Sequence, residues 1–76
     1  MKELLQYMVE RMVDRPEAIS ITETQREGGI VYELRVAPGD IGKVIGRSGH
    51  VARDLRTLIK ASAKEGQRVT IDIIDD

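Results

Sequence analysis

The stretch between residues 30 and 73 contains a strand pattern, two helical patterns and a second strand pattern in succession. Large apolar residues recur at every second position from Ile30 to Val36 and again from Val69 to Ile73, which is typical of β-strands. Because two helices separate the strands, we expect the later strand to return parallel to the earlier one through a right-handed crossover. The strand at residues 30–37 is then predicted to lie at the centre of the sheet.

The residues before this unit predict one further helix and one further strand. Apolar residues at the spacing of an amphipathic helix run from Leu4 to Val13, and Pro16 stops that helix. Alternation resumes at 19–22, and Gly28-Gly29 predicts a hairpin turn into the central strand. The predicted fold class is therefore α+β, in the order α-β-β-α-α-β, with a three-stranded mixed sheet and all three helices packed on one face.

The two helices between the later strands differ in length. The segment that starts at Ala37 breaks the central strand, and Asp40 is a predicted N-cap for a short helix that begins at Ile41 and ends at Gly46. A longer helix is expected from about residue 50 to residue 64. A tight loop joins the two helices.

Composition limits what a chain of 76 residues can do. This length predicts a single domain over residues 1–76. Phe and Trp are absent and Tyr occurs twice, so we expect an aliphatic core. If the chain binds nucleic acid, its contacts with the bases are expected to be aliphatic or hydrogen-bonded rather than stacked on aromatic rings. The chain has no cysteine and one histidine, which argues against disulfides, thiolate zinc sites and any other metal or cofactor site. The first residues match neither a signal peptide nor a membrane span, so a cytoplasmic, soluble protein is expected.

The net charge of −1 conceals a strongly uneven distribution. Residues 41–64 hold six basic residues and one acidic residue, whereas the segments on both sides are acidic. Charge placement, more than total charge, creates an electrostatic footprint for a polyanion. The alternative interpretation is a solvated helix face, which charge alone does not distinguish from a binding surface.

The most informative segment is Ile41–His50, in which Gly46 and Gly49 stand three residues apart between the two helical patterns. Glycines allow a sharp turn and the close approach of a phosphodiester backbone. The loop also begins the long helix, whose free N–H groups and positive dipole end favour a phosphate. Arg47 and Ser48 add a positive charge and a hydroxyl group, so the loop is a predicted phosphate contact that reads no base sequence.

Aliphatic side chains near this loop have two possible roles. Ile41, Val44 and Ile45 could form a groove for unstacked bases together with Leu34 or Val36, as expected for single-stranded RNA. The alternative is that these side chains belong to the core.

The segment Val44-Ile45-Gly46-Arg47-Ser48-Gly49 resembles the V-I-G-x-x-G signature of KH domains, whose loop clamps about four nucleotides. The element order is similar to the type II arrangement, in which the extra helix and strand come first. The closest resemblance is to the KhpA-type family of small bacterial proteins with one KH domain, over essentially the whole chain. The residues that this resemblance and the basic surface assign to RNA binding are Lys43, Ile45, Gly46, Arg47, Ser48, Gly49, His50, Arg53 and Arg56.

The resemblance implies a cytoplasmic RNA-binding protein that binds single-stranded RNA with low sequence specificity, as an RNA chaperone or post-transcriptional regulator. It further implies a homodimer or a heterodimer with a larger KH protein of the Jag type, and no membrane partner. The alternative function is a protein-interaction module that dimerises or docks to such a partner with little RNA binding of its own. Leu4, Met8 and Met12 are candidates for the partner surface or for the core.

Enzymatic functions are not supported by the same segment. A Walker A loop needs four residues between its glycines and then Lys followed by Ser or Thr, whereas Lys43 is followed by Val44. No hydroxyl group, general base and orienting group can be assembled, so no catalytic residue is assigned. His50 stands alone, and the aspartates at the end of the chain, Asp72, Asp75 and Asp76, are interpreted as solubilising.

Overall fold

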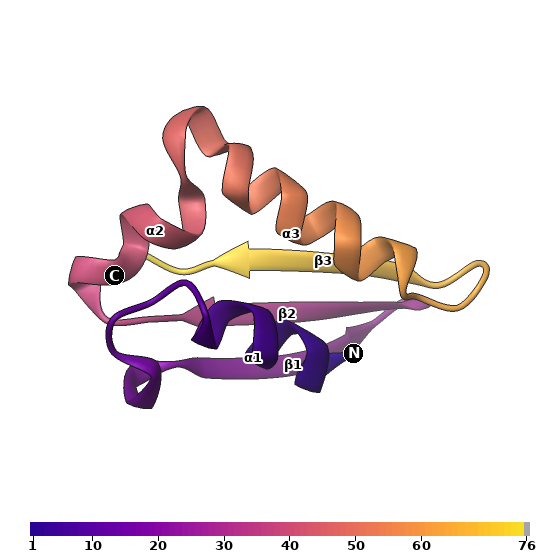
Figure 1. Cartoon of the computed structure of the whole chain (residues 1–76). Helices are drawn as coiled ribbons and strands as arrows, with labels where there is room; N and C mark the ends of the chain where they lie inside the picture. The colour runs from indigo at the N-terminus through magenta and orange to yellow at the C-terminus, as the bar shows by residue number, and fades with distance from the viewer. Residues whose placement is uncertain (76) are drawn as a thin grey trace.

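The computed structural model describes residues 1–75, and the predicted order of helices and strands is confirmed (Figure 1). Asp76 of the predicted acidic end lies outside the described residues. Short 3-10 turns occur at Pro16–Ala18, Pro38–Asp40 and Arg47–Gly49. The regular elements are α1 (Lys2–Glu10), β1 (Ser20–Arg26), β2 (Gly29–Arg35), α2 (Ile41–Ile45), α3 (His50–Ala61) and β3 (Arg68–Ile73).

The three strands form a mixed sheet in the order β1-β2-β3. β1 pairs antiparallel with β2, placing Ile21 opposite Leu34, and β3 pairs parallel with β2, placing Ile73 beside the same Leu34. The predicted central strand and the parallel return through α2 and α3 are thus confirmed.

One face of the sheet packs against the helices, and the buried residues of all three helices join a single cluster with those of the strands. Leu5 and Val9 of α1 and Leu55 and Ile59 of α3 are almost fully buried. Side chains alternate between the two faces of each strand, and alternate residues such as Thr22, Thr70 and Asp72 are exposed. The other face of the sheet is therefore not covered by these helices. The fold is a two-layer α+β structure. The strand residues of the cluster are Ile21, Tyr32, Leu34, Val69 and Ile71.

The core contains an aromatic residue, so the expectation of a purely aliphatic core was wrong. Tyr32 on the central strand is only 2% exposed. Burial raises the pKa of Tyr32, and the nearby Glu23 carboxylate raises it further. Tyr32 lies on the side of the central strand that faces the helices, so its ring is enclosed in the core.

Both long helices end earlier than the sequence pattern predicts. α1 ends at Glu10, although Met12 and Val13 still pack against the core after the last helical turn. α3 ends at Ala61, three residues before the predicted end at residue 64. The apolar pattern marks the side chains that contact the core, whether or not they are helical. Because Met12 and Val13 make such contacts from the irregular segment after α1, the pattern extends beyond the end of the helix.

The hairpin turn lies one residue earlier than predicted. Arg26 pairs with Gly29, so Glu27 and Gly28 are the two turn residues, with φ of 24° and 76°. Positive φ at both positions is the pattern of a type I′ turn, which suits the twist of a two-residue hairpin. Gly29 is instead the first residue of β2, where an added Cβ would lie 3.0 Å from the Cβ of Arg68.

Candidate nucleic-acid interface

The loop between α2 and α3 projects away from the sheet (Figure 1). Arg47 and Ser48 at its tip are exposed, and Gly46 and Gly49 on either side are half-buried. Gly46, Ser48 and Gly49 have φ of 76°, 55° and 75°. Three residues with positive φ within four positions turn the chain sharply and present Arg47 and Ser48 to solvent.

The two loop glycines are required for different reasons. A Cβ on Gly46 would lie 2.3 Å from Cγ2, 2.8 Å from Cβ and 2.9 Å from the backbone nitrogen of Val51. A Cβ on Gly49 would meet nothing within 4 Å. Gly46 therefore allows the first turn of α3 to pack against the loop, whereas Gly49 provides only backbone freedom and open space. Nothing in the sequence indicates the contact between Gly46 and Val51.

Backbone hydrogen bonds inside the loop determine which N–H groups are available. The N–H of Gly46 donates to Gly42 and the N–H of Gly49 donates to Gly46, at 2.9 and 3.2 Å. The N–H of His50 donates to the carbonyl of Arg47, so the first of the N–H groups predicted to be free at the first turn of α3 is used inside the loop. Within residues 1–75, no backbone hydrogen bond uses the N–H of Arg47 or Ser48.

The predicted basic residues of α3 differ in how firmly they are held. Arg53 is exposed and Arg56 is half-buried. Nε of Arg56 donates to the carbonyl oxygen of Ile71 at 3.2 Å, which places this side chain along the outer edge of β3. His50 at the start of the helix is exposed. Together with Arg47, these side chains extend from the loop along one flank of α3.

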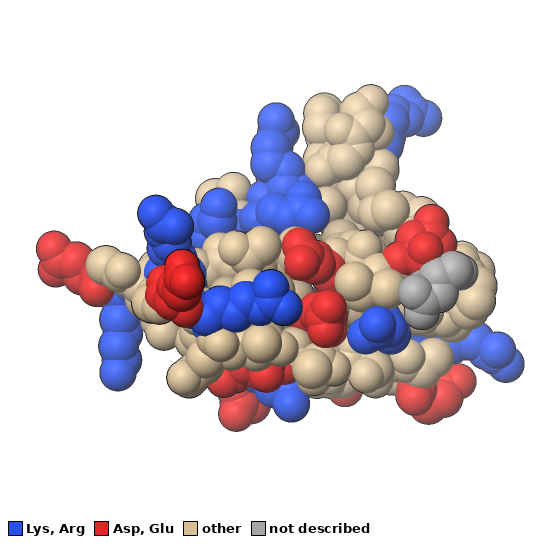
Figure 2. Space-filling model, turned by 180° about the vertical axis from the view of Figure 1, so that it is seen from behind, with Lys and Arg blue, Asp and Glu red and all other residues tan. Residues whose placement is uncertain are grey.

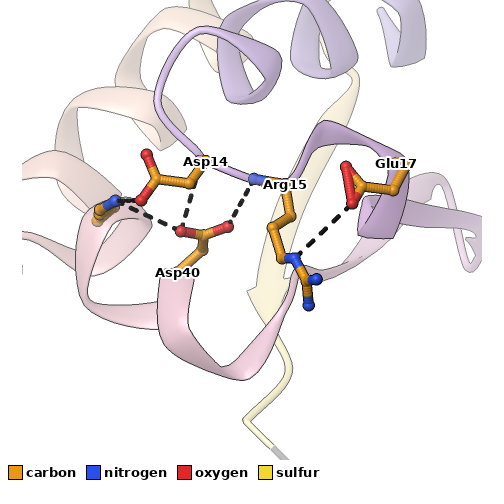
Figure 3. Close-up of polar contacts among 5 residues, drawn as sticks. Asp14, Arg15, Glu17 and Asp40 are labelled. Atoms are coloured by element: carbon orange, nitrogen blue, oxygen red, sulfur yellow. Dashed lines mark hydrogen bonds and ion pairs between the residues drawn. The ribbon is translucent and has the colours of Figure 1, made fainter.

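Lys43 differs from the other basic residues of this region because its ammonium group pairs with two carboxylates of the same chain, those of Asp14 and Asp40 (Figure 3). Its ammonium group contacts a carboxylate oxygen of Asp14 and lies 3.6 Å from Oδ1 of Asp40. The hydrogen bond to Asp14 opposes the effect of burial and, with both carboxylate charges, raises the pKa of Lys43. Much of the positive charge that the sequence assigned to RNA at this position is compensated by these carboxylates.

Asp40 joins α2 to the segment that follows α1. Its side chain is buried, and its two oxygens accept hydrogen bonds from the backbone N–H groups of Asp14 and Arg15 at 3.2 and 3.1 Å (Figure 3). Asp40 occupies the N-cap position of α2, but its side chain makes no capping hydrogen bond, so the predicted capping role was wrong. Burial alone would raise the pKa of Asp40, yet these two N–H groups and Lys43 outweigh that effect and lower it.

Only part of the predicted aliphatic groove is open. Val44 and Leu34 are fully buried, so both belong to the core. Ile45 beside the loop is half-buried and remains a candidate base contact. Ile41 and Val36, which are also half-buried, line a small hollow of about 130 Å³ between β2 and the start of α2. Pro38 and Ile74 complete its apolar wall.

A parallel β-α-α-β unit with a G-x-x-G loop between its helices, preceded by one helix and one strand, defines a type II KH domain. Comparison with known proteins agrees with this class. A family model described as KhpA/KhpB, KH domain, matches residues 2–73. The chain therefore belongs to the KhpA/KhpB family of KH-domain proteins, which are not known as enzymes.

Three relatives illustrate how far the similarity extends, and each is named RNA-binding protein KhpA. The protein from Clostridium acetobutylicum is 47% identical over 97% of this chain and 100% of its own length. The one from Treponema pallidum is 47% identical over 97% of this chain and 94% of its length. The Chlamydia muridarum protein is 42% identical over 100% of this chain and 99% of its length. No solved structure shows significant similarity to the chain.

Residues 1–75 contain neither a helix suited to span a membrane nor a cluster of side chains suited to hold a metal ion. None of the helices in this region has the length and apolar character that crossing a membrane requires. The same residues contain no group of three or more His, Cys, Asp or Glu side chains arranged to hold a metal ion.

Proposed function

We propose that this chain, as a single KH domain over residues 1–76, binds single-stranded RNA through the loop Gly46-Arg47-Ser48-Gly49. The observation that carries the proposal is the projecting loop, where two glycines hold Arg47 and Ser48 in solvent. Binding of this kind, with low sequence specificity, suits an RNA chaperone or post-transcriptional regulator in the cytoplasm. The relatives named RNA-binding protein KhpA support the same assignment.

The side chains around the loop have different proposed roles in RNA binding. The guanidinium group of Arg47, the hydroxyl group of Ser48 and the unused N–H groups of both residues contact phosphate oxygens. Arg53 lies on the path of the strand beyond the loop, and His50 lies at its beginning. The partly exposed Ile45 provides an apolar contact for a base. The full set of proposed RNA-contacting residues is Ile45, Gly46, Arg47, Ser48, Gly49, His50, Arg53 and Arg56. Lys43, which the sequence also assigned to RNA, lies beside them, but its ammonium group pairs with Asp14 and Asp40 and contributes little to phosphate binding.

Low sequence specificity follows from the position of the aromatic residues. Stacking of a base on an aromatic ring contributes about 1–3 kcal/mol in many single-strand binders. Tyr32 is buried, and Tyr7 lies on α1 with the guanidinium carbon of Arg11 4.4 Å from its ring centre. Neither tyrosine belongs to the loop or its flanking helices. Phosphate contacts, which carry no sequence information, therefore dominate the affinity.

The proposal is tested by fluorescence anisotropy with a labelled single-stranded tetranucleotide and an Arg47→Asp, Ser48→Asp double variant. Both side chains are exposed, so each substitution changes the free energy of unfolding by about 0.5 kcal/mol or less. The wild type is expected to bind with a dissociation constant that rises with salt, and the folded variant is expected not to bind. Equal binding by both proteins would show that the loop is not the RNA contact.

A second candidate function is self-association or docking to a larger Jag-type KH protein, with little RNA binding of its own. Exposed apolar residues favour it: Leu58 on α3 is 54% exposed, and Tyr7 and Leu4 on α1 are 53% and 38% exposed. Met8 and Met12, the other candidates for a partner surface, pack against the core.

Light scattering across a range of protein concentrations distinguishes the two functions. If the surfaces are separate, Leu58→Glu abolishes self-association and leaves tetranucleotide binding intact, and the Arg47→Asp, Ser48→Asp variant does the reverse. Loss of both properties in both variants would instead show that one surface serves both functions.

A further inference from the structure

We propose that the RNA path does not end at the loop but continues along α3 to a second phosphate-binding subsite formed by Lys60 and Arg68. This inference rests on the proposed function, because it extends the track of the same single strand. No residue of this subsite was assigned to RNA binding from the sequence motif.

The basic residues of α3 share one flank of the helix. Arg53, Arg56 and Lys60 are separated by three and four positions, so they project from the same side. The hydrogen bond from Arg56 to the carbonyl of Ile71 shows that this side faces the outer edge of β3. Asp54, the acidic residue of this helix, lies about 200° around the axis from Arg56 and about 100° from Arg53, so no acidic residue of α3 lies between the three basic side chains.

The flank leads to a hollow at the far end of the helix. Lys60 from α3 and Arg68 from the start of β3 line the same hollow, whose volume is about 410 Å³. Gln67 and Thr70 add polar side chains to its wall, and Val69 adds an apolar one. The side chains of Lys60 and Arg68 are exposed, and neither takes part in an ion pair within residues 1–75. Two unpaired cations from different elements thus meet at one concave site.

The distance between the loop and the hollow determines how many nucleotides the path needs. Figure 2 shows Lys and Arg side chains along the upper edge of the molecule and near its left end, with acidic side chains between and beyond them. From Gly49 to Lys60 the helix rises by about 16 Å. An extended strand covers that distance with about three nucleotides beyond the four that a KH loop holds.

The ligand of this subsite is therefore the phosphodiester backbone of single-stranded RNA, several nucleotides away from the segment held by the loop. Exposed guanidinium and ammonium groups bind phosphate oxygens without reading bases. The subsite lengthens the footprint and raises affinity for longer strands, without adding sequence preference.

The test compares a tetrauridylate with an octauridylate by fluorescence anisotropy, using wild type and a Lys60→Gln, Arg68→Gln double variant. The octamer is expected to bind the variant about tenfold more weakly than wild type at low salt, as two lost exposed ion pairs imply. The tetramer is expected to bind both proteins within about twofold, because the loop alone holds it. The salt dependence of octamer binding, log K against log[salt], should become shallower by about 1.4, or about 0.7 for each lost phosphate contact.

Arg11→Gln is the matched control, since it removes an exposed positive charge at the C-cap of α1, away from the proposed path, and should leave octamer binding unchanged. An octamer affinity and salt slope that are the same in the double variant as in wild type would overturn the second subsite while leaving the loop assignment intact. Failure of wild type to bind the tetramer would overturn the proposed function itself. Circular dichroism of each variant verifies that the protein is folded.

Discussion

Replacing Gly46 by alanine is expected to destabilise the protein far more than the same change at Gly49, although the two glycines have nearly the same φ. At Gly49 (φ 75°, ψ 12°) alanine would adopt the left-handed helical region at a cost of about 1–2 kcal/mol, whereas Gly46 (φ 76°, ψ 174°) lies in a region that essentially only glycine adopts, at about 1–3 kcal/mol. At Gly46 the new methyl group would also lie 2.3, 2.8 and 2.9 Å from three atoms of Val51. Rotation of the Val51 side chain relieves the contact with Cγ2 but not those with Cβ and the backbone nitrogen.

Overpacking of this kind costs a further 1–3 kcal/mol, roughly, so the total for Gly46→Ala is about 2–6 kcal/mol. That is a large fraction of the stability of a small domain, which is about 5–15 kcal/mol. Urea denaturation followed by far-ultraviolet circular dichroism measures both variants against wild type. A Gly46→Ala variant that is no less stable than Gly49→Ala would refute the argument that the extended ψ of Gly46 and its contact with Val51 together require glycine at this position.

Three further results are expected. Asp40→Asn lowers the melting temperature at neutral pH. The difference in melting temperature from wild type narrows as pH falls below 3.8, the ordinary pKa of an aspartate, because the wild type then loses the stability that the lowered pKa of Asp40 represents. A difference in melting temperature that stays constant across pH would contradict this. Lys43→Gln leaves the salt dependence of tetranucleotide binding almost unchanged, whereas Arg47→Gln makes its slope shallower by about 0.7; equal changes in the two variants would show that Lys43 also contacts phosphate. Glu27→Asn raises the free energy of unfolding by about 0.5 kcal/mol in urea titrations, because asparagine tolerates positive φ in a type I′ turn; no gain would argue against that turn geometry.

The topology of the sheet was predictable because local patterns determine it. Two helices lie between β2 and β3, so a crossover that brings β3 parallel to β2 is the simplest connection. The right-handed sense of such a crossover follows from the twist of the strands. The position of the hairpin turn was not predictable in the same way. Gly28-Gly29 offered two candidate turn residues, and the register that pairs Arg26 with Gly29 assigns Glu27 to a left-handed position that the sequence does not mark.

The loop of the candidate site was recognisable from the spacing of Gly46 and Gly49, but the environment of its neighbours was not. Lys43 meets Asp14, 29 positions earlier in the chain, and Asp40 accepts hydrogen bonds from the backbone of the same segment. Contacts between such distant positions arise only when α1 and α2 pack on the sheet, so charge counting along the chain overestimates the positive charge that Lys43 offers to RNA.

The most direct test of the central claim is a two-dimensional ¹H–¹⁵N NMR titration of the protein with a single-stranded tetranucleotide. The account predicts that the largest shifts occur at the amides of Arg47, Ser48 and Gly49 and at the first turn of α3, with smaller shifts on the uncovered face of the sheet. Largest shifts on α1 or on that uncovered face, with the loop amides unmoved, would contradict it.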